Sequence, residues 1–340
     1  MLSGAFFFPL DEHMKIHDVA VIGGGSAGVM AVLRTVLNND ECLFFPGSPK
    51  DKKRSRAFWV TKVENMPGHL EYKKGIDEPN KESLDWLAAG PFKDKLIWKK
   101  NTGIVSVKKE EDGIFTLTDN KNEVYQARYV ILCTGVMDVQ PTIQGSIETI
   151  YPYANIQLAD YCLRCDGHHV LNKKIAIFGH NSGAAWVGIM LYERYQCPEV
   201  TILTNGEAPS FDEETTALMK RYNFKIVTEA ITEIKGDPKN KILNGFVCGD
   251  KNVEADYAFI ALGMIVYNEL AKMLGANLDQ RGFVVTDNKG KSSVDGLYVA
   301  GDLRANTKKQ IYTAWDGAVD SADEINVLIR RKKRTEASLL

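Results

Sequence analysis

Long apolar runs, an excess of one charge and a dense set of cysteines are all missing from this 340-residue sequence. No run approaches the roughly 18 apolar residues of a membrane-spanning helix. The 42 basic residues nearly balance the 44 acidic ones, so the formal net charge of -2 gives no general attraction to nucleic acid. Hydrophobic residues still make up 44% of the chain, enough to bury a core in about two domains. We therefore expect a soluble, cytoplasmic protein that binds neither membranes nor nucleic acid.

The six cysteines are too sparse and too irregular for the disulfide framework of a small secreted protein. Cys42 and Cys133 lie in apolar, strand-like runs, where a cysteine behaves as a small hydrophobic residue. Together with Cys197 and Cys248 they are expected to be buried thiols. Residues 1–13 contain three consecutive phenylalanines but have neither a basic segment nor a small-residue cleavage site. We interpret them as a tail and not as a signal peptide.

The other two cysteines lie in the hexapeptide Cys162-Leu163-Arg164-Cys165-Asp166-Gly167. A CxxC pair alone fits a zinc site, an iron–sulfur site, a redox disulfide or two structural thiols. His168 and His169 follow directly and belong to the vocabulary of zinc sites. However, four ligands from eight consecutive residues would need a very tight loop, and no second Cys/His cluster is present to complete a site. We therefore expect no metal here.

Two glycine-rich turns flank this hexapeptide. Residues 18–22 predict a strand, residues 29–37 predict an apolar helix, and Gly23-Gly24-Gly25-Ser26-Ala27-Gly28 joins them as a GxGxxG turn. Gly23 permits the tight turn, Gly25 lets the backbone approach a pyrophosphate, and Gly28 lets the helix pack closely on the strand. The N–H groups at the helix N-terminus favour the anion. This context predicts a nucleotide-binding site.

A second, incomplete copy of this unit follows the hexapeptide. Its turn is Gly179-His180-Asn181-Ser182-Gly183-Ala184, after a predicted strand at 174–178 and before a predicted helix at 185–194 and strand at 200–204. Short alternating segments at 104–107, 114–118 and 124–125 predict a small antiparallel sheet. Further strands end in small residues at 129–135, 257–263 and 297–302, and a helical run follows from about 310 to 330. Such strand ends are where open α/β sheets bind ligands.

Several motifs occur here in a fixed order: the first GxGxxG, Val63-Glu64-Asn65-Met66-Pro67-Gly68, Thr134-Gly135, the hexapeptide, and Ala300-Gly301-Asp302 followed by Gln310. From about residue 14 to 330 the chain resembles the low-molecular-weight thioredoxin reductase family of flavoprotein disulfide oxidoreductases. The resemblance implies an α/β fold with two dinucleotide-binding, Rossmann-like domains, each with a three-layer ββα arrangement. It also implies a homodimer. The implied parts are a tail at 1–13, a discontinuous FAD domain at 14–138 and 270–330, a middle domain with the CxxC at 139–269, and a tail at 331–340.

The resemblance also implies which residues bind FAD. Gly23, Gly25 and Gly28 would hold the pyrophosphate, Asn65 would lie near the isoalloxazine, and Asp302 would accept a hydrogen bond from the ribityl chain. The full expected set is Gly23, Gly25, Ser26, Ala27, Gly28, Asn65, Thr134, Gly135, Gly301, Asp302, Gln310 and Ile311. One element of the pattern is missing, because the strand after the first helix ends at Pro46 without the acid that normally binds the ribose. We expect Ser48 or backbone groups to hold the adenosine instead.

By the same resemblance, Cys165 is the thiol next to the flavin and Cys162 is the thiol that exchanges with substrate. Asp166 would act as general acid and base for this exchange. The disulfide partner would be a thioredoxin-like protein or a small disulfide. Two alternatives stay open: a dithiol oxidase that passes electrons to oxygen, and a non-catalytic redox sensor that uses the flavin and dithiol as a switch.

The second glycine turn departs from a nicotinamide site. Asn181 replaces its second glycine, and no basic cluster follows the strand at 200–204 to bind the 2′-phosphate of NADPH. We therefore expect NADPH binding to be lost or weak. A ferredoxin is one alternative electron donor, for which Lys50, Lys52, Lys53, Arg54 and Arg56 and the run Arg330 to Arg334 offer two basic patches. Trp186 and Tyr192, in the helix after the turn, are expected to pack in the core.

Overall fold

This computed structural model describes residues 15–48, 56 and 59–338 of the chain. Packing divides the described residues into two units, which are treated separately. The first contains residues within 1–55, 80–135 and 266–340, and the second contains 56–79 and 136–265. The predicted tail at 1–13 and the basic residues 50–54 lie outside the described residues. The domain boundaries expected at 138/139 and 269/270 stay predictions beside these units.

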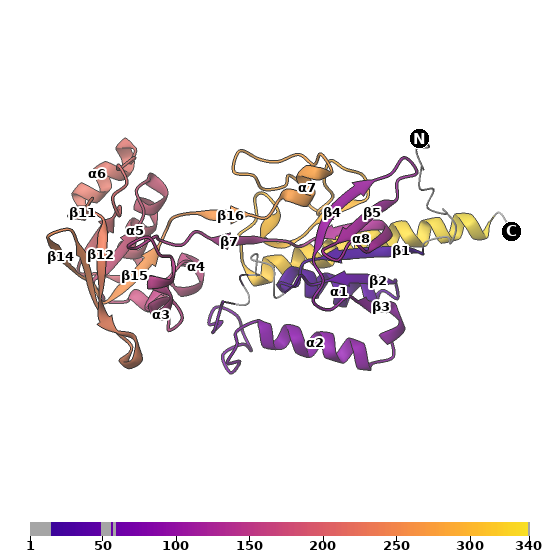
Figure 1. Ribbon diagram of the computed structural model, residues 1–340, viewed down its shortest axis with the longest axis horizontal. Coiled ribbons are helices and arrows are strands. Elements are labelled where there is room, and N and C mark those ends of the chain that lie inside the picture. The colour runs from indigo at the N-terminus through magenta and orange to yellow at the C-terminus, as the bar shows by residue number, and fades with distance from the viewer. Residues whose placement is uncertain (1–14, 49–55, 57–58, 339–340) are drawn as a thin grey trace, which may run out of the picture. The chain divides into compact units, whose positions relative to one another are not determined.

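The first unit is built on a seven-stranded sheet in the order β3-β2-β1-β6-β5-β4, with β17 also paired to β6 (Figure 1). Its strands are β1 (Ile16–Ile22), β2 (Cys42–Phe45), β3 (Leu96–Trp98), β4 (Ile104–Lys109), β5 (Phe115–Asp119), β6 (Val124–Leu132) and β17 (Leu297–Val299). Its helices are α1 (Ser26–Leu37), most of α2 (Asp77–Ala89), α7 (Glu269–Met273) and α8 (Ile311–Ala337), with 3-10 turns η2 (Lys93–Lys95) and η6 (Gly301–Leu303).

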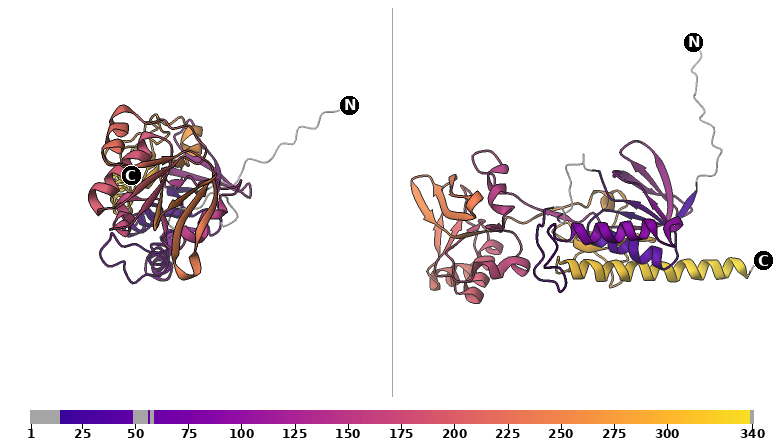
Figure 2. Two further views of the ribbon diagram at one scale, coloured as in Figure 1. Left: turned by 90° about the vertical axis from the view of Figure 1, so that its left-hand side faces the viewer. Right: turned by 90° about the horizontal axis from the view of Figure 1, so that it is seen from below.

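The pleat of β1 divides the core of this unit into two clusters. Val19 and Val21 face a cluster that includes side chains of α1 and α8, whereas Ala20 and Ile22 face one that includes residues of β4, β5 and β6. The two helices run beside each other on the first face (Figure 2), where Arg34 Nη2 donates to Asp323 Oδ2 at 2.9 Å. The result is a sheet covered on both faces, as expected for a dinucleotide-binding domain.

One strand joins two elements that the sequence treated separately. β6 runs without a break from Val124 to Leu132, so the alternating segment at 124–125 and the apolar segment from 129 belong to one strand. Its first half pairs antiparallel with β5, and its second half pairs in parallel with β1 and β17. The predicted antiparallel sheet is therefore a meander that continues the parallel sheet.

The last helix is longer than the predicted run of 310–330. α8 continues to Ala337, and its buried residues Ala314, Ala318, Ala322, Ile325 and Ile329 recur at helical spacing. Arg330 Nη2 donates to Asp40 Oδ1 at 2.8 Å and also to the carbonyl of Asn38 at 2.6 Å. Arg330 thus anchors the helix to the first unit, and residues 331–334 are exposed.

The second unit holds a five-stranded parallel sheet in the order β11-β10-β9-β15-β8 and a three-stranded antiparallel sheet. The parallel strands are β8 (Ala159–Asp160), β9 (Ile175–Phe178), β10 (Val200–Leu203), β11 (Lys225–Val227) and β15 (Tyr257–Ile260). The antiparallel sheet contains β12 (Ile231–Asp237), β13 (Ile242–Cys248) and β14 (Lys251–Glu254), while β7 (Val136–Asp138) pairs with β16 (Met264–Val266). The helices and turns are η3 (Glu148–Ile150), α3 (Tyr151–Ala154), α4 (Leu163–Asp166), η4 (Gly167–Val170), α5 (Ser182–Tyr195), α6 (Glu213–Arg221) and η5 (Pro238–Asn240).

The aromatic residues of α5 pack as expected. Tyr192 stacks on Tyr222 with ring centroids 4.8 Å apart and meets Phe224 edge-on, and Trp186 packs against the same hydrophobic cluster. These side chains hold α5 on the parallel sheet. None of the helices in the described part of the chain combines the length and the apolar character that a bilayer crossing requires.

Candidate active site

The hexapeptide forms a disulfide at the start of a short helix. Cys162 is the N-cap of α4, and its Sγ accepts a hydrogen bond from the backbone N–H of Cys165 at 3.1 Å. The one-turn spacing brings the two Cα atoms to 5.2 Å, within the range that a disulfide spans, and the two sulfur atoms are bonded. Cys162 and Cys165 are therefore a closed dithiol pair.

The other four cysteines are buried free thiols, as the sequence predicted. Burial raises the pKa of the Cys133 thiol to about 12 and that of Cys197 and Cys248 to about 11, and it raises the pKa of Cys42 further. A thiol with a raised pKa is a poor nucleophile because the thiolate is the reactive form. Thiol chemistry is thus confined to Cys162 and Cys165.

Asp166 has the electrostatics of an acid that works near neutral pH. Burial raises the pKa of its carboxyl to about 7, and the nearby Asp160 carboxylate adds to the increase, while His169 acts in the opposite direction. A carboxylate oxygen of Asp166 and the two sulfur atoms of the disulfide all lie within 4.8 Å of one another. Asp166 can therefore exchange a proton with a sulfur atom at physiological pH.

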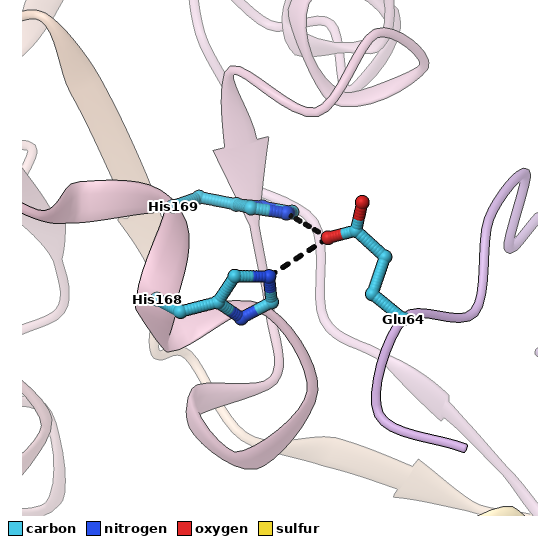
Figure 3. Close-up of side chains that lie close together, drawn as sticks. All are labelled: Glu64, His168 and His169. Carbon is cyan, nitrogen blue, oxygen red and sulfur yellow. Dashed lines mark hydrogen bonds and ion pairs between the residues drawn. The ribbon is translucent and has the colours of Figure 1, made fainter. Parts of the chain in front are cut away.

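Asp160 and His169 lie close to Asp166, and they belong to a group of side chains that the sequence did not predict as a site. Figure 3 shows Glu64 reaching from its loop toward His168 and His169, which are neighbours on η4. Glu64 Oε2 lies 2.8 Å from His168 Nε2 and 2.6 Å from His169 Nε2. The other ring nitrogen of His169 lies 3.0 Å from Asp160 Oδ2. Tyr257 completes the set, since its hydroxyl donates to Asp160.

These residues gave a weak signal in the sequence. The sequence shows His168 and His169 only as candidate zinc ligands. It shows Glu64 only as one residue of the motif at 63–68. Glu64 and His168 are 104 positions apart. Asp160 ends a strand of only two residues, which is too short for a recognisable pattern.

The predicted FAD-binding residues of the first unit meet at one edge of its sheet. β1, β6 and β17 are adjacent parallel strands, and their carboxyl ends lead into Gly23, Thr134 and Gly301 respectively. A Cβ on Gly301 would lie 2.7 Å from the Cβ of Ala27, so the third strand end contacts the glycine turn directly. The chain thus brings together at the strand ends what the sequence spreads over about 280 positions.

The glycine turn itself is shaped for a bound phosphate. A Cβ on Gly28 would lie 1.8 Å from the carbonyl oxygen of Gly23, so only glycine allows α1 to approach the strand this closely. Gly25 caps α1 without a side chain, and the first turn of the helix holds no acidic residue. The N–H groups at this end are therefore not used by a side-chain cap, as a pyrophosphate requires. These residues fit an FAD pyrophosphate.

Other members of the expected set have structural partners. Thr134 Oγ1 donates to the carbonyl of Tyr267 at 2.6 Å, and Gln310 caps α8 in a reciprocal capping box with Thr313. Asp302 lies in η6, immediately after Gly301. Asn65 belongs to the second unit, one residue after Glu64.

The equivalent helix end in the second unit is built differently. Asn181 caps α5 with its own side chain, since its Oδ1 accepts the N–H of Ala184 at 3.2 Å. A following segment crosses this end: Ser210 N–H donates to the carbonyl of His180 at 2.7 Å, and Asp212 N–H donates to Ser182 Oγ at 2.8 Å. The N-terminus of α5 therefore has protein partners where that of α1 has none from a side chain.

A family described as pyridine nucleotide-disulphide oxidoreductase matches residues 17–322. The chain belongs to this family. A thioredoxin reductase of Listeria innocua is 26% identical over 338 residues, covering 95% of this chain and 97% of that protein. A thioredoxin reductase of Helicobacter pylori is 28% identical over 327 residues, covering 92% and 98% respectively. The crystal structure of TrxB from Bacillus anthracis matches with a TM-score of 0.77 at 21% identity, covering 93% of this chain and 99% of that one.

These comparisons confirm several predictions for this oxidoreductase. It is an FAD-dependent disulfide oxidoreductase with an α/β fold of two dinucleotide-binding domains, and it resembles the thioredoxin reductases along nearly its whole length. FAD, when bound, supplies two-electron chemistry to the disulfide. The electron donor and the disulfide partner are matters of proposal.

Proposed function

We propose that this oxidoreductase passes electrons from FAD to the Cys162–Cys165 disulfide and from there to the disulfide of a thioredoxin-like protein. The observation that supports this most directly is the disulfide itself, which lies beside an acid whose pKa of about 7 suits proton exchange at neutral pH. The thioredoxin reductases that align over almost the whole chain support a thioredoxin-like partner.

Each residue of the dithiol has a separate role in this proposal. Cys165 is the sulfur that faces the flavin, and Cys162 is the sulfur that attacks the external disulfide. Asp166 gives a proton to one sulfur when the internal disulfide opens, and it removes that proton again when the thiol attacks substrate. Gly23, Gly25 and Gly28 hold the FAD pyrophosphate against the N-terminus of α1.

Replacement of Cys162 by serine tests these roles. Cys165 should then stay as a thiolate next to the oxidised flavin and give a long-wavelength charge-transfer band. Cys197→Ser is a matched control, because Cys197 is a buried free thiol. A Cys162→Ser protein that binds FAD but shows no such band would contradict the assignment of the two thiols. Oxygen consumption with a dithiol substrate would instead favour the dithiol oxidase.

We also propose that the electron donor is not NADPH. The side-chain cap from Asn181 uses the Ala184 N–H, a donor that a pyrophosphate would need. The crossing segment at Ser210 and Asp212 is bonded to the His180 carbonyl and the Ser182 hydroxyl, and so lies across this helix end. The carboxylate of Asp212 also places a negative charge near this helix end, which disfavours a phosphate. Residues 204–212 contain neither lysine nor arginine for a 2′-phosphate. A ferredoxin is the alternative donor that the family resemblance offers.

The donor is tested by anaerobic titration of the FAD-bound protein, with the flavin absorbance as the signal. NADPH and NADH should leave the flavin oxidised, whereas reduced ferredoxin should bleach it. Dithionite serves as a control that the flavin can be reduced. Rapid bleaching by NADPH would refute this part of the proposal but leave the dithiol roles intact.

A further inference from the structure

The His169 side chain lies between two carboxylates, and its surroundings suggest a role beyond packing. We infer that His169 is a positioning residue that links Asp166 to solvent, returning protons to it through Glu64 and His168. The inference rests on the proposed function, in which Asp166 exchanges protons with the dithiol. His168 and His169 lie outside the family motifs described above, whereas Glu64 belongs to the motif of residues 63–68.

The geometry fixes the protonation state of His169. Its Nε2 lies 2.6 Å from Glu64 Oε2, and its Nδ1 lies 3.0 Å from Asp160 Oδ2. A neutral imidazole has only one N–H, so one of these carboxylates would face a lone pair. Both contacts are favourable only if both ring nitrogens carry a proton. Hydrogen bonds to Asp160 and Glu64 accordingly raise the pKa of His169 to about 9.

The inner end of the proposed proton path, at Asp166 and His169, lies close to the dithiol. One ring nitrogen of His169 and carboxylate oxygens of Asp160 and Asp166 all lie within 4.8 Å of one another. Asp166 is in turn within 4.8 Å of both sulfur atoms. A single bridging water or a small rotation of the Asp166 side chain spans such a separation. Protons can therefore pass between the imidazolium and Asp166 without leaving the protein.

The outer end reaches solvent. Glu64 Oε2 is shared by His169 and His168, and the His168 side chain is half exposed whereas that of His169 is only 17% exposed. The order from inside to outside is thus Asp166, His169, Glu64 and His168. Figure 3 shows the outer three members converging on one carboxylate oxygen.

The redox step creates the need for such a path. Reduction of the Cys162–Cys165 disulfide takes two electrons from the reduced flavin, breaks the S–S bond and leaves two thiolates. One thiolate takes the proton of Asp166 and becomes a thiol, so Asp166 is left as a carboxylate. The final product is a pair of thiols, whereas oxidation of the anionic reduced flavin releases only one proton, so this half-reaction takes up one further proton from solvent. His169 supplies a proton to Asp166 and regains one through Glu64 and His168.

Other charged groups lie beside this proton path and affect the pKa values of its members. Lys62 pairs with the second oxygen of Glu64, and this pair together with the hydrogen bonds from the histidines holds the pKa of Glu64 at about 2. Arg56 acts on Asp166 from its own segment, where its Nε donates to Asp138 at 2.9 Å. Lys173 Nζ lies 4.9 Å from the ring centre of Tyr257. Glu64 therefore rests as a carboxylate between the two histidines, and it holds a proton only transiently when one passes from His168 to His169.

The test uses the full-length, FAD-bound protein reduced with dithionite and mixed anaerobically with cystamine, while flavin reoxidation is followed by stopped flow. The natural protein should react at a rate that does not depend on imidazole buffer concentration at constant ionic strength. His169→Gln should react at least 10-fold more slowly in dilute buffer and should recover as imidazole increases. His69→Gln is the matched control, because His69 is a partly exposed histidine of the Glu64 segment whose Nδ1 lies 3.0 Å from the Pro67 carbonyl oxygen.

Several outcomes would overturn the inference. If His169→Gln reacts slowly and imidazole does not restore its rate, the substitution has damaged the structure and not a proton path. If His169→Gln reacts as fast as the natural protein, His169 has no role in the reaction. Glu64→Gln keeps an oxygen acceptor and gives an independent check, since it should show the same dependence on buffer. Bound FAD and an unchanged circular dichroism spectrum confirm that each variant folds. If the natural protein itself transfers no electrons to any disulfide, the proposed function fails and this inference falls with it.

Discussion

In the proposed function, Asp166 acts on the dithiol through one property, a pKa of about 7 that burial mainly produces. Asp166→Asn keeps the size of the side chain but removes its exchangeable proton. We expect the rate of disulfide exchange to fall by about 100-fold, at the lower end of the range for general acid–base catalysis. FAD binding should be unchanged.

The pH profile provides the check on Asp166. In the natural protein, the step that needs the protonated acid should slow as the pH rises through about 7, and in Asp166→Asn this dependence should vanish. Asp250→Asn, which removes an exposed carboxylate in the same unit, is the control. An Asp166→Asn protein with normal rates across the pH range would show that another group moves the proton. Stopped-flow measurement with an external disulfide gives the rates.

His169 predicts a pH dependence of stability. Its pKa is higher in the folded protein, about 9, than the ordinary histidine value of about 6.5. The stabilisation is therefore fully present below about pH 6.5 and is lost as the pH rises through about 9. We expect the free energy of unfolding to fall by on the order of 2 kcal/mol across this window.

The measurement is urea unfolding at pH 6 and at pH 9.5. His169→Gln should remove most of the difference between the two pH values, whereas His69→Gln should keep it. Equal pH dependence in all three proteins would show that His169 is not charged in the folded state. The result therefore tests the contact of His169 with Glu64, drawn in Figure 3, together with its contact with Asp160.

Among individual residues, the sequence revealed those whose type and spacing are tied to backbone geometry. The CxxC spacing places two sulfur atoms on one helical turn, and the glycines of the first turn are required where a Cβ would collide with a carbonyl oxygen. Glu64, Asp160 and Tyr257 were not predicted as site residues. Glu64 and Tyr257 lie 105 and 88 positions from His169, so their contacts with it depend on tertiary packing that no local pattern encodes. Asp160 is only nine positions away, but its two-residue strand gives no recognisable pattern.

The two glycine turns show how similar elements diverge. Both lead from a parallel strand into a helix, but α1 begins at Gly25 without a side-chain cap and α5 begins at Asn181 with one. A side-chain cap satisfies a helix N–H that a phosphate would otherwise bind. Asn181, in place of the second glycine of the motif, thus gives α5 a side-chain cap that α1 lacks.

Gly28→Ala tests the role of α1. The added Cβ would lie 1.8 Å from the Gly23 carbonyl oxygen, so the turn must open and the affinity for FAD should fall by more than 10-fold. Gly183→Ala in the first turn of α5 is the matched control. There the nearest atom to the new Cβ is Asn181 Oδ1 at 3.1 Å, and FAD binding should be unaffected. Flavin fluorescence on dilution measures the affinity, and loss of FAD from both variants would contradict the assignment.

The sequence predicted most elements but not how all of them join. The strands and helices that flank both glycine turns appear where the apolar runs and glycines place them. β6 was divided in two because its pattern changes from alternating to continuously apolar where its neighbours change from antiparallel to parallel. The predicted end of the last helix, at residue 330, is too early. The last turns of α8 are highly charged and exposed, and so lack the apolar stripe that predicts a helix.

For the molecule as a whole, the presence of two dinucleotide-binding domains was predictable because the sequence contains two strand–turn–helix units. The matched family covers both of them, from residue 17 to 322. The surface that a protein donor would use was less predictable. Of the two expected basic patches, residues 50–54 lie outside the described residues, Arg56 pairs with Asp138, and Arg330 pairs with Asp40.

Residues 331–334 are exposed on α8, where Lys332 lies 3.9 Å from Glu336 and Lys333 lies 3.8 Å from Asp18. If an acidic ferredoxin reduces the flavin, the rate should fall steeply as ionic strength rises, because steering between opposite charges is screened by salt. Arg331→Glu combined with Arg334→Glu should slow the reaction and weaken its salt dependence. Arg221→Glu on α6 is the control. An unchanged rate and salt slope in the double variant would place the donor elsewhere.

Cys42, Cys133, Cys197 and Cys248 are buried, so the number of thiols that can be labelled in the native protein depends only on the Cys162–Cys165 pair. An alkylating reagent reaches only thiols that are both exposed and ionised, so the oxidised protein should take up no label and the reduced one should take up two. Denaturation of the reduced protein would bring the number to six, the full cysteine content of the chain. The mass of the labelled native protein therefore reports directly how much of the dithiol is reduced inside a living cell.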